Sequence, residues 1–273
     1  MLDLANGRRA ALVALLATCA SGYSGASTAT TLFNGGIPPG WTCTGSCGTS
    51  AADGVVTLAP GGGTQYGWVS TNNGVPQSGL GLGEETDGST LLSQEFSVTA
   101  GQDLSFQFNY VTSDGAGYAD YGWAELLNGS KDVVALLFTA RTTPDGNSVP
   151  GFGMPTIAAT ITPSTVVITP GAPAFSPLGG SSGTCFDAGC GYSGWVQSDY
   201  TIGSSGDYYL EFGVVNWADQ AYQTAMAFDG ITIGGQQIGG GGTVPEPATL
   251  GLLGLGLAAI GLARRGRRQR GFH

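Results

Sequence analysis

The chain has 273 residues, of which 49 are glycine and 10% are charged, and its 19 acidic and 9 basic side chains give a net charge of −10 at pH 7. So few Lys, Glu and Arg residues exclude a body built from long helices. Arg8, Arg9 and the arginines after residue 263 leave Lys131 and Arg141 as the only basic residues between Ser27 and Thr243, and a surface this acidic repels phosphate backbones, which excludes nucleic acid as a partner.

Residues 1–26 have the order of a secretory signal peptide. Arg8 and Arg9 precede the apolar run Ala10–Ala20, and small residues follow up to Ser24-Gly25-Ala26. The run is shorter than the about 20 residues that span a bilayer, so cleavage is favoured over a permanent anchor. The sequence Leu16-Ala17-Thr18-Cys19 is similar to a lipoprotein box, and lipidation at Cys19 stays open as an alternative.

Residues 27–238 alternate apolar and polar side chains in short runs bounded by turn residues, which predicts β-strands. The clearest strand is Leu104–Tyr110, and Leu91–Val98 precedes it across an Ala100-Gly101 turn, so we expect these two to pair as a hairpin. Further strands are expected at Tyr121–Leu127, Val133–Thr139, Trp195–Tyr200, Tyr208–Trp217 and Ala225–Ile233, with weaker ones at Val55–Leu58 and Gln65–Val69.

The segment Thr142–Gly183 is rich in Pro, Gly and Ser, and it is expected to be a long irregular excursion around one strand at Ser164–Thr169. Nine or so strands with no convincing helix predict an all-β fold, an antiparallel β-sandwich or jelly roll.

Four cysteines lie in this body, Cys43 and Cys47 near its start and Cys185 and Cys190 near its end. An even number of cysteines in an exported chain favours disulfides. Three pairings are possible, and we favour the two local ones, Cys43 with Cys47 and Cys185 with Cys190, because each would fix a Gly-rich loop. A zinc site made of the four thiolates is the alternative, although the spacing suits zinc less well.

The body contains no histidine, because the single histidine is His273. This excludes Ser-His-Asp and Cys-His hydrolysis, zinc catalysis based on histidine and histidine general-base chemistry. A pair of carboxylates could still hydrolyse glycosides, but so many Asp and Glu residues are present that their number points to no particular pair. We therefore expect no catalytic residues and keep a secreted glycosidase as an alternative.

Acidic residues on two predicted loops are candidate calcium ligands, because Ca²⁺ prefers carboxylate oxygens on flexible loops. They are Glu84 and Asp87 on one loop and Asp114 and Asp120 on the other, with Asp229 as a further ligand. Neither loop fits the EF-hand template, and solvated acidic loops are the favoured interpretation. No cofactor is therefore expected, and calcium stays an alternative.

Aromatic residues are the other candidate binding groups. Tyr118, Tyr121 and Trp123 lie close in sequence to Asp114 and Asp120, and rings beside carboxylates suit stacking on sugars, so they are the predicted glycan contacts. The competing interpretation is core packing, since aromatic residues in strands usually face inward. The strand-rich body resembles jelly-roll carbohydrate-binding modules only at the level of the fold.

Residues 239–243 read as a Gly-rich linker, and residues 244–273 as a sorting tail. The tail begins with Val244-Pro245-Glu246-Pro247, whose prolines suit an extended segment before a helix. The apolar stretch Ala248–Ala263 would form a short transmembrane helix. The cluster of Arg264, Arg265, Arg267, Arg268 and Arg270 would keep the tail's end in the cytoplasm and the body outside.

This order of Pro-Glu-Pro, short apolar span and arginine cluster resembles the PEP-CTERM sorting signal. The resemblance implies processing by exosortase, an integral-membrane enzyme of Gram-negative bacteria that make exopolysaccharide and biofilm or floc matrix. It implies an inner-membrane intermediate, attached to the membrane through the C-terminal helix, and then a cell-surface or extracellular protein. The expected function is non-catalytic interaction in a biofilm, floc or exopolysaccharide, with a carbohydrate-binding module as the first alternative.

Overall fold

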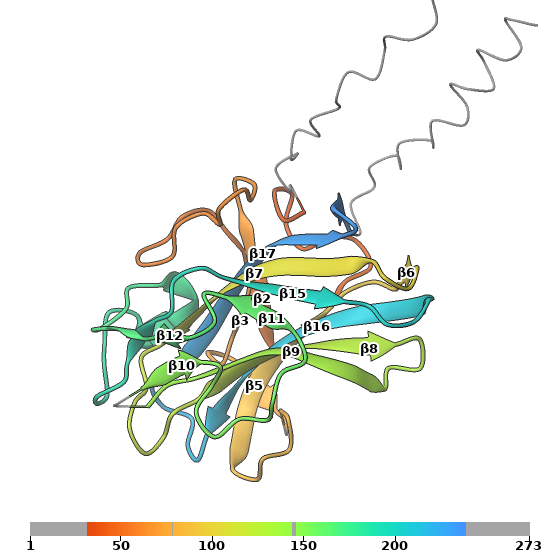
Figure 1. The fold of residues 1–273 in the computed structure, drawn as a ribbon. Coiled ribbons are helices and arrows are strands. Elements are labelled where there is room, and N and C mark those ends of the chain that lie inside the picture. Colours follow the sequence, from red (N-terminus) through yellow and green to blue (C-terminus); the bar gives the residue numbers. More distant parts are fainter. Residues whose placement is uncertain (1–31, 78, 144–145, 239–273) are drawn as a thin grey trace, which may run out of the picture.

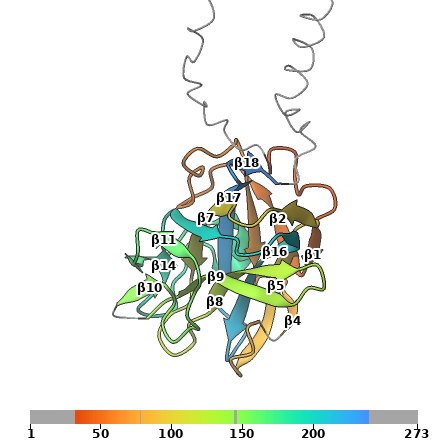
Figure 2. The ribbon, with the colours of Figure 1, turned by 45° about the vertical axis from the view of Figure 1, so that its right-hand side comes forward.

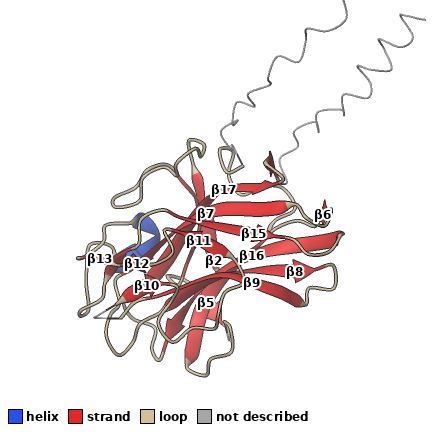
Figure 3. Ribbon diagram, in the orientation of Figure 1, coloured by secondary structure: helices blue, strands red, loops and turns tan. Residues whose placement is uncertain are grey.

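The computed structural model describes residues 32–77, 79–143 and 146–238. Within them the chain forms strands β1 to β18 and one short 3-10 helix, η1 (Ser176–Ser181). The strands form two antiparallel sheets that face each other, as Figure 1 shows, and Figure 3 shows how little helix accompanies them. The predicted all-β sandwich is confirmed.

The first sheet, sheet I, has the strand order β1-β5-β16-β8-β9, with β4 beside β5 and β6 beside β16. Its strands are β1 (Thr42–Thr44), β4 (Val75–Pro76), β5 (Glu85–Leu92), β6 (Phe96–Val98), β8 (Tyr121–Asn128), β9 (Val133–Arg141) and β16 (Gly206–Trp217). All of these pairs are antiparallel.

The second sheet, sheet II, has the order β11-β15-β7-β17-β3-β2, with β14 beside β7, β13 beside β14 and β18 beside β17. Its strands are β2 (Ser46–Ser50), β3 (Tyr66–Ser70), β7 (Asp103–Thr112), β11 (Thr160–Thr162), β13 (Thr169–Pro170), β14 (Gly191–Tyr192), β15 (Val196–Thr201), β17 (Thr224–Ile233) and β18 (Gln236–Gln237). Strands β10 (Asn147–Val149) and β12 (Val166–Val167) pair separately.

The core lies between the two sheets and is rich in phenylalanine. The ring of Phe108 in sheet II stacks on Phe138 in sheet I, with centroids 3.7 Å apart. Phe212 and Phe228 repeat this arrangement at 4.0 Å. All four side chains are fully buried, so each pair ties the two sheets together face to face.

Both predicted disulfides are present. Cys43 bonds to Cys47, and Cys185 bonds to Cys190. Cys43 pairs with Leu91 in sheet I, whereas Cys47 pairs with Val69 in sheet II. The first disulfide therefore joins the edge strands of the two sheets where the chain passes from one to the other.

Most predicted strands are confirmed, and two expectations are wrong. The predicted Leu91–Val98 strand is divided into β5 and β6, and both pair with β16 rather than with β7. Residues 93–95 separate them, and within this gap the Ser93 side-chain oxygen accepts a hydrogen bond from the Leu210 N–H at 2.9 Å. Alternation of apolar residues shows that a segment is a strand, but it does not identify the partner strand.

The second wrong expectation is the weak strand at Val55–Leu58, where the structure shows only an isolated bridge between Asp53 and Val56. The Thr142–Gly183 excursion contains more order than predicted, namely β10 to β13 and η1. Among the described residues no helix is long and apolar enough to cross a bilayer. The predicted signal peptide, linker, transmembrane helix and arginine cluster lie outside the described residues.

Candidate ligand-binding site

Three aromatic side chains gather on the surface at one end of the sandwich. Tyr118, Phe186 and Tyr222 expose 40%, 43% and 37% of their area. The ring of Phe186 lies between the other two, with centroid distances of 5.6 Å to Tyr118 and 5.0 Å to Tyr222. We call these three residues the aromatic cluster. Grouped exposed rings are a common mark of an interaction site.

Each ring comes from a different loop, and hydrogen bonds between backbone groups hold the loops together. The Phe186 N–H donates to the Ser113 carbonyl at 2.9 Å, and the Ala116 N–H donates to the Ala188 carbonyl at 2.9 Å. The Ser113 N–H in turn donates to the Gln223 carbonyl at 3.1 Å. The loops 113–120, 184–190 and 218–223 therefore form one connected unit.

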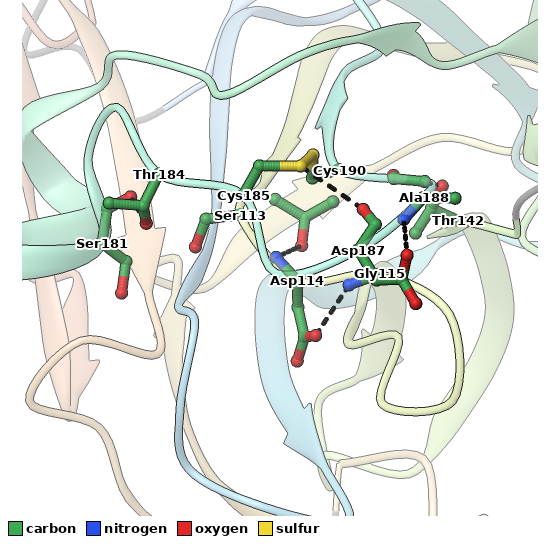
Figure 4. Close-up of a disulfide and its surroundings, with 12 residues drawn as sticks. Ser113, Asp114, Gly115, Thr142, Ser181, Thr184, Cys185, Asp187, Ala188 and Cys190 are labelled. Carbon is green, nitrogen blue, oxygen red and sulfur yellow. Dashed lines mark hydrogen bonds between the residues drawn. A yellow bond between two sulfur atoms is a disulfide. The ribbon is translucent and has the colours of Figure 1, made fainter.

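The disulfide between Cys185 and Cys190 closes the loop that carries Phe186, as Figure 4 shows. Cys190 is buried, whereas Phe186 points to solvent. The Thr142 hydroxyl fixes the same loop by donating to the Gly189 carbonyl at 2.6 Å. Gly115 in the loop 113–120 packs against this loop, and a Cβ added there would come within 2.7 Å of the carbonyl oxygens of Asp187 and Ala188. Only glycine allows the two loops to approach this closely.

Two buried aspartates lie in the floor of the site. Asp120 accepts hydrogen bonds from the Trp217 N–H at 2.9 Å and the Thr224 hydroxyl at 2.7 Å. Asp114 Oδ1 accepts a hydrogen bond from the Gly115 N–H at 2.7 Å, as drawn in Figure 4. Its second oxygen, Oδ2, is buried without a hydrogen-bond partner among the described residues. The floor thus combines acidic groups with incomplete hydrogen bonding.

Burial shifts the titration of both aspartates in the same direction. It raises the pKa of Asp114 to about 7, with a further contribution from the charge of Asp219. It also raises the pKa of Asp120 well above the usual value, and the nearby Asp114 carboxylate adds to this shift. The floor therefore binds protons far more readily than exposed aspartates do.

The loop that carries Tyr222 holds two non-glycine residues in the left-handed backbone region. The φ angles are 68° at Ala218 and 53° at Tyr222. Side chains other than glycine are strained there by about 1–2 kcal/mol each. Such strain persists only where surrounding contacts impose it, and it concentrates at functional sites.

The site lies at the end of the sandwich away from the described C-terminal residues. Thr224, the first residue of β17, borders the aspartate floor, and Ile233 ends the strand on the side of β18. An extended strand of this length spans about 30 Å. The first described residues and β18 lie together at that other end in both Figure 1 and Figure 2. A tail that follows residue 238 therefore starts about one strand length from the aromatic cluster.

The predicted glycan contacts do not form one surface. Tyr118 is exposed, but Tyr121 and Trp123 expose 0% and 1% of their area, so this part of the prediction is wrong. Both begin β8 on the outer face of sheet I. The Tyr121 hydroxyl donates to Glu85 at 2.7 Å, and the Trp123 ring covers Gly213, where an added Cβ would lie 2.2 Å from it. Loops cover this face, so alternation alone could not tell that it is buried.

The predicted calcium ligands are divided between different surroundings. Asp87 accepts a hydrogen bond from the Asn216 side chain at 2.9 Å, whereas Asp114 and Asp120 lie in the floor described above. Asp229 accepts a hydrogen bond from the Gly63 N–H at 3.2 Å, and Glu84 accepts one through its main-chain carbonyl. Within residues 32–77, 79–143 and 146–238 no group of three or more His, Cys, Asp and Glu side chains could hold a metal ion. Calcium binding stays a prediction.

A carboxylate pair is present on the outer face of sheet I. Glu125 in β8 and Glu211 in β16 are direct cross-strand partners, and both are half-buried. Burial raises the pKa of Glu125 to about 7, and repulsion from Glu211 adds to the rise. Burial also raises the pKa of Glu211, whereas the positive charge of Lys131 lowers it. Opposed residues place their Cβ atoms about 5 Å apart, so this pair has the composition that glycoside hydrolysis uses.

Phe186 and Tyr222 are not among the site residues that the sequence predicts. A usable signal existed for Phe186, because it lies between two cysteines only 5 positions apart. A side chain in so short a closed loop has little room to turn into the core. No comparable signal marks Tyr222, which lies in the loop 218–223 with a φ angle of 53°.

Comparison with known proteins gives one match in the tail and distant likenesses for the body. No curated protein matches the chain. The K1 cleaved adhesin domain of Lys-gingipain from Porphyromonas gingivalis W83 is 12% identical, with a TM-score of 0.32, over 73% of this chain and 92% of that one. The K3 domain of the same protein is 14% identical, with a TM-score of 0.35, over 74% and 94%.

The enzymatically active domain of tailspike protein 4 from bacteriophage CBA120 is 9% identical, with a TM-score of 0.32, over 76% of this chain and 20% of that one. TM-scores this low carry no argument about function. Residues 243–268, by contrast, match the family model of the PEP-CTERM protein-sorting motif. The chain therefore carries a PEP-CTERM protein-sorting motif, which implies an exported protein that is processed by an exosortase and sorted to the cell surface.

Proposed function

We propose that this protein is a non-catalytic surface protein of a biofilm or floc and that its β-sandwich binds exopolysaccharide through the aromatic cluster. The observation that carries the proposal is the exposure of three rings on three loops that hydrogen bonds and a disulfide hold together. Sugar rings have apolar faces formed by C–H groups, and aromatic rings bury such faces favourably. Loops that are already ordered lose little entropy on binding.

The place of the site in the molecule supports this function. The sorting motif at residues 243–268 follows the end of the sandwich at which β18 lies. The aromatic cluster is at the other end of β17, about 30 Å away. While the tail anchors the protein in the membrane, a binding surface at that end lies away from the anchored end and is accessible to ligands.

Binding of the full-length chain, purified in detergent, to the native host's exopolysaccharide tests the proposal. Phe186→Ala should weaken binding about tenfold or more, as expected for a central aromatic contact. The matched control is Phe152→Ala, because Phe152 exposes 63% of its area and lies outside the three loops. Equal binding by the two variants would refute a role for the cluster.

The mass of the intact protein recovered from host membranes and medium tests the sorting route separately. We expect a product that ends near Pro245-Glu246-Pro247 in the surface or medium fraction, with the tail removed. A mature product that still contains His273 would contradict exosortase processing.

A second candidate function is glycoside hydrolysis, which the Glu125 and Glu211 pair favours. In that case Glu125, whose pKa is raised to about 7, would be the proton donor. Release of reducing ends from host exopolysaccharide would support it, provided that Glu125→Gln abolishes the release. Binding without release would support the non-catalytic function.

A further inference from the structure

Two acidic residues lie on the loops that carry Phe186 and Tyr222. Asp187 directly follows Phe186 and is exposed, and Asp219 lies three positions before Tyr222 and is half-exposed. Each uses one carboxylate oxygen to accept a hydrogen bond from a nearby backbone N–H, at 2.7 Å from Ala188 and 2.9 Å from Ala221. These bonds orient the carboxylates on the same loops as the rings, and each leaves the second carboxylate oxygen without another hydrogen bond among the described residues.

The two basic side chains among the described residues pack on rings outside the aromatic cluster. The Arg141 guanidinium lies over the ring of Trp217, 4.2 Å from its centroid, and its Nε donates to the Ala119 carbonyl at 2.9 Å. Lys131, the other basic residue among the described ones, lies over Tyr209 near the start of β16, whereas the site borders the end of that strand. An anionic ligand at the aromatic cluster would therefore meet the carboxylates of Asp187 and Asp219 on the same loops, whereas neither cation makes a cation-π contact with the cluster.

Rings combined with carboxylates favour a particular ligand chemistry. A cation over the face of an aromatic ring gains about 0.5–1 kcal/mol at an exposed position. Carboxylates add Coulomb attraction, which acts over about 10 Å at moderate ionic strength. Carboxylates can also accept hydrogen bonds from neutral sugar hydroxyls, but only a cation gains from the net negative charge of the surroundings.

We propose that the aromatic cluster, with Asp187 and Asp219, selects glycans that carry protonated amino groups, that is, amino sugars whose nitrogen is not acetylated. This inference rests on the proposed function, because it names the class of glycan that the same site takes. The ammonium group would lie against the rings of Phe186 and Tyr222, and the carboxylates would neutralise its charge.

Calorimetric titration of the full-length chain at pH 6 tests the inference, with glucosamine oligosaccharides, N-acetylglucosamine oligosaccharides and galacturonate oligosaccharides of equal length as probes. The glucosamine oligosaccharide should bind about tenfold more tightly than its acetylated counterpart. Raising the ionic strength from about 0.1 M to about 1 M should reduce this preference, since the Debye length falls from about 10 Å to about 3 Å. The galacturonate oligosaccharide should not bind.

Variants separate local charge from net charge. The double variant Asp187→Asn with Asp219→Asn should lose most of the preference for free amines. The double variant Asp132→Asn with Asp103→Asn removes the same two charges, in the turn between β8 and β9 and at the start of β7, and should keep the preference. Equal binding of the glucosamine and N-acetylglucosamine probes, or a preference that persists in the double variant, would overturn the inference while leaving the proposed function in place. If no glycan binds in a manner sensitive to Phe186→Ala, both the inference and the proposed function are wrong.

Discussion

The rings of Phe186 and Tyr222 lie with their centroids 5.0 Å apart at an angle of 45°, although they come from loops on either side of β14, β15 and β16. The contact exists because both loops are bonded to Ser113, Phe186 through its N–H and Gln223 through its carbonyl. Ser113 follows the end of β7, so the central strand of sheet II places the cluster. Changes in this support should weaken binding.

The two disulfides should differ in their effect on binding. Replacing Cys185 and Cys190 by Ser releases the loop of Phe186, and we expect exopolysaccharide binding to weaken about tenfold through lost preorganisation. Replacing Cys43 and Cys47 by Ser should lower the melting temperature, because that bond joins the two sheets, but binding should stay within about twofold when measured at a temperature where both variants are folded. An equal loss of binding in both double variants would contradict the role assigned to the Cys185–Cys190 disulfide.

Gly115→Ala should displace the disulfide loop. Its Cβ would come within 2.7 Å of two carbonyl oxygens of that loop, which cannot move without breaking the contact between Ala116 and Ala188. We expect weaker binding and destabilisation of about 1–3 kcal/mol in chemical denaturation. Gly203→Ala is the control, because nothing lies within 4 Å of its added Cβ. Unchanged binding by Gly115→Ala would show that the loop contact is not needed.

Ala218→Gly should stabilise the protein. Relief of the left-handed strain at φ 68° contributes about 1–2 kcal/mol, and the greater freedom of glycine in the unfolded chain offsets about 0.4–1 kcal/mol of this. We expect a net gain of about 0.5–1 kcal/mol in the free energy of unfolding. The control Ala221→Gly, at a residue without positive φ, should destabilise instead. A loss of stability in both variants would show that Ala218 is not strained.

Stability should fall with rising pH because of Glu125. Its pKa is about 7 in the folded protein against 4.5 without burial, so the folded state disfavours the ionised form. The contribution of this group to stability is fully present below about pH 4.5, and it is lost as pH rises to about 7. Glu125→Gln should therefore raise stability at pH 8, by on the order of 1 kcal/mol since solvent screens a half-exposed group, and leave it nearly unchanged at pH 4.

Melting curves of the Glu125→Gln variant and of the native chain at pH 4 and pH 8 measure this effect. Glu95→Gln serves as the control, because Glu95 is exposed and should show no comparable difference between the two pH values. A Glu125→Gln variant that is less stable than the native chain at pH 8 would mean that the carboxylate makes a favourable contact there.

The sequence predicts the sandwich and both disulfides because strand periodicity and cysteine spacing are local properties. Leu104 to Tyr110 alternate and form the central part of β7, and each cysteine pair lies within 5 positions. The partner of each strand is a long-range property, which is why the sequence predicts that Leu91–Val98 pairs with β7, whereas β5 and β6 pair with β16. The sequence predicts the site only in part, because its residues come together through long-range contacts. Tyr118 was selected, but its neighbours Phe186 and Tyr222 come together through tertiary contacts.

Mapping of amide chemical shifts during titration of the isotope-labelled full-length chain with host exopolysaccharide tests the central claim most directly, because it locates the ligand on the surface. The account predicts that the largest changes fall in the three loops 113–120, 184–190 and 218–223. Largest changes around Glu125 and Glu211 on the outer face of sheet I would contradict it and would favour the hydrolytic candidate instead.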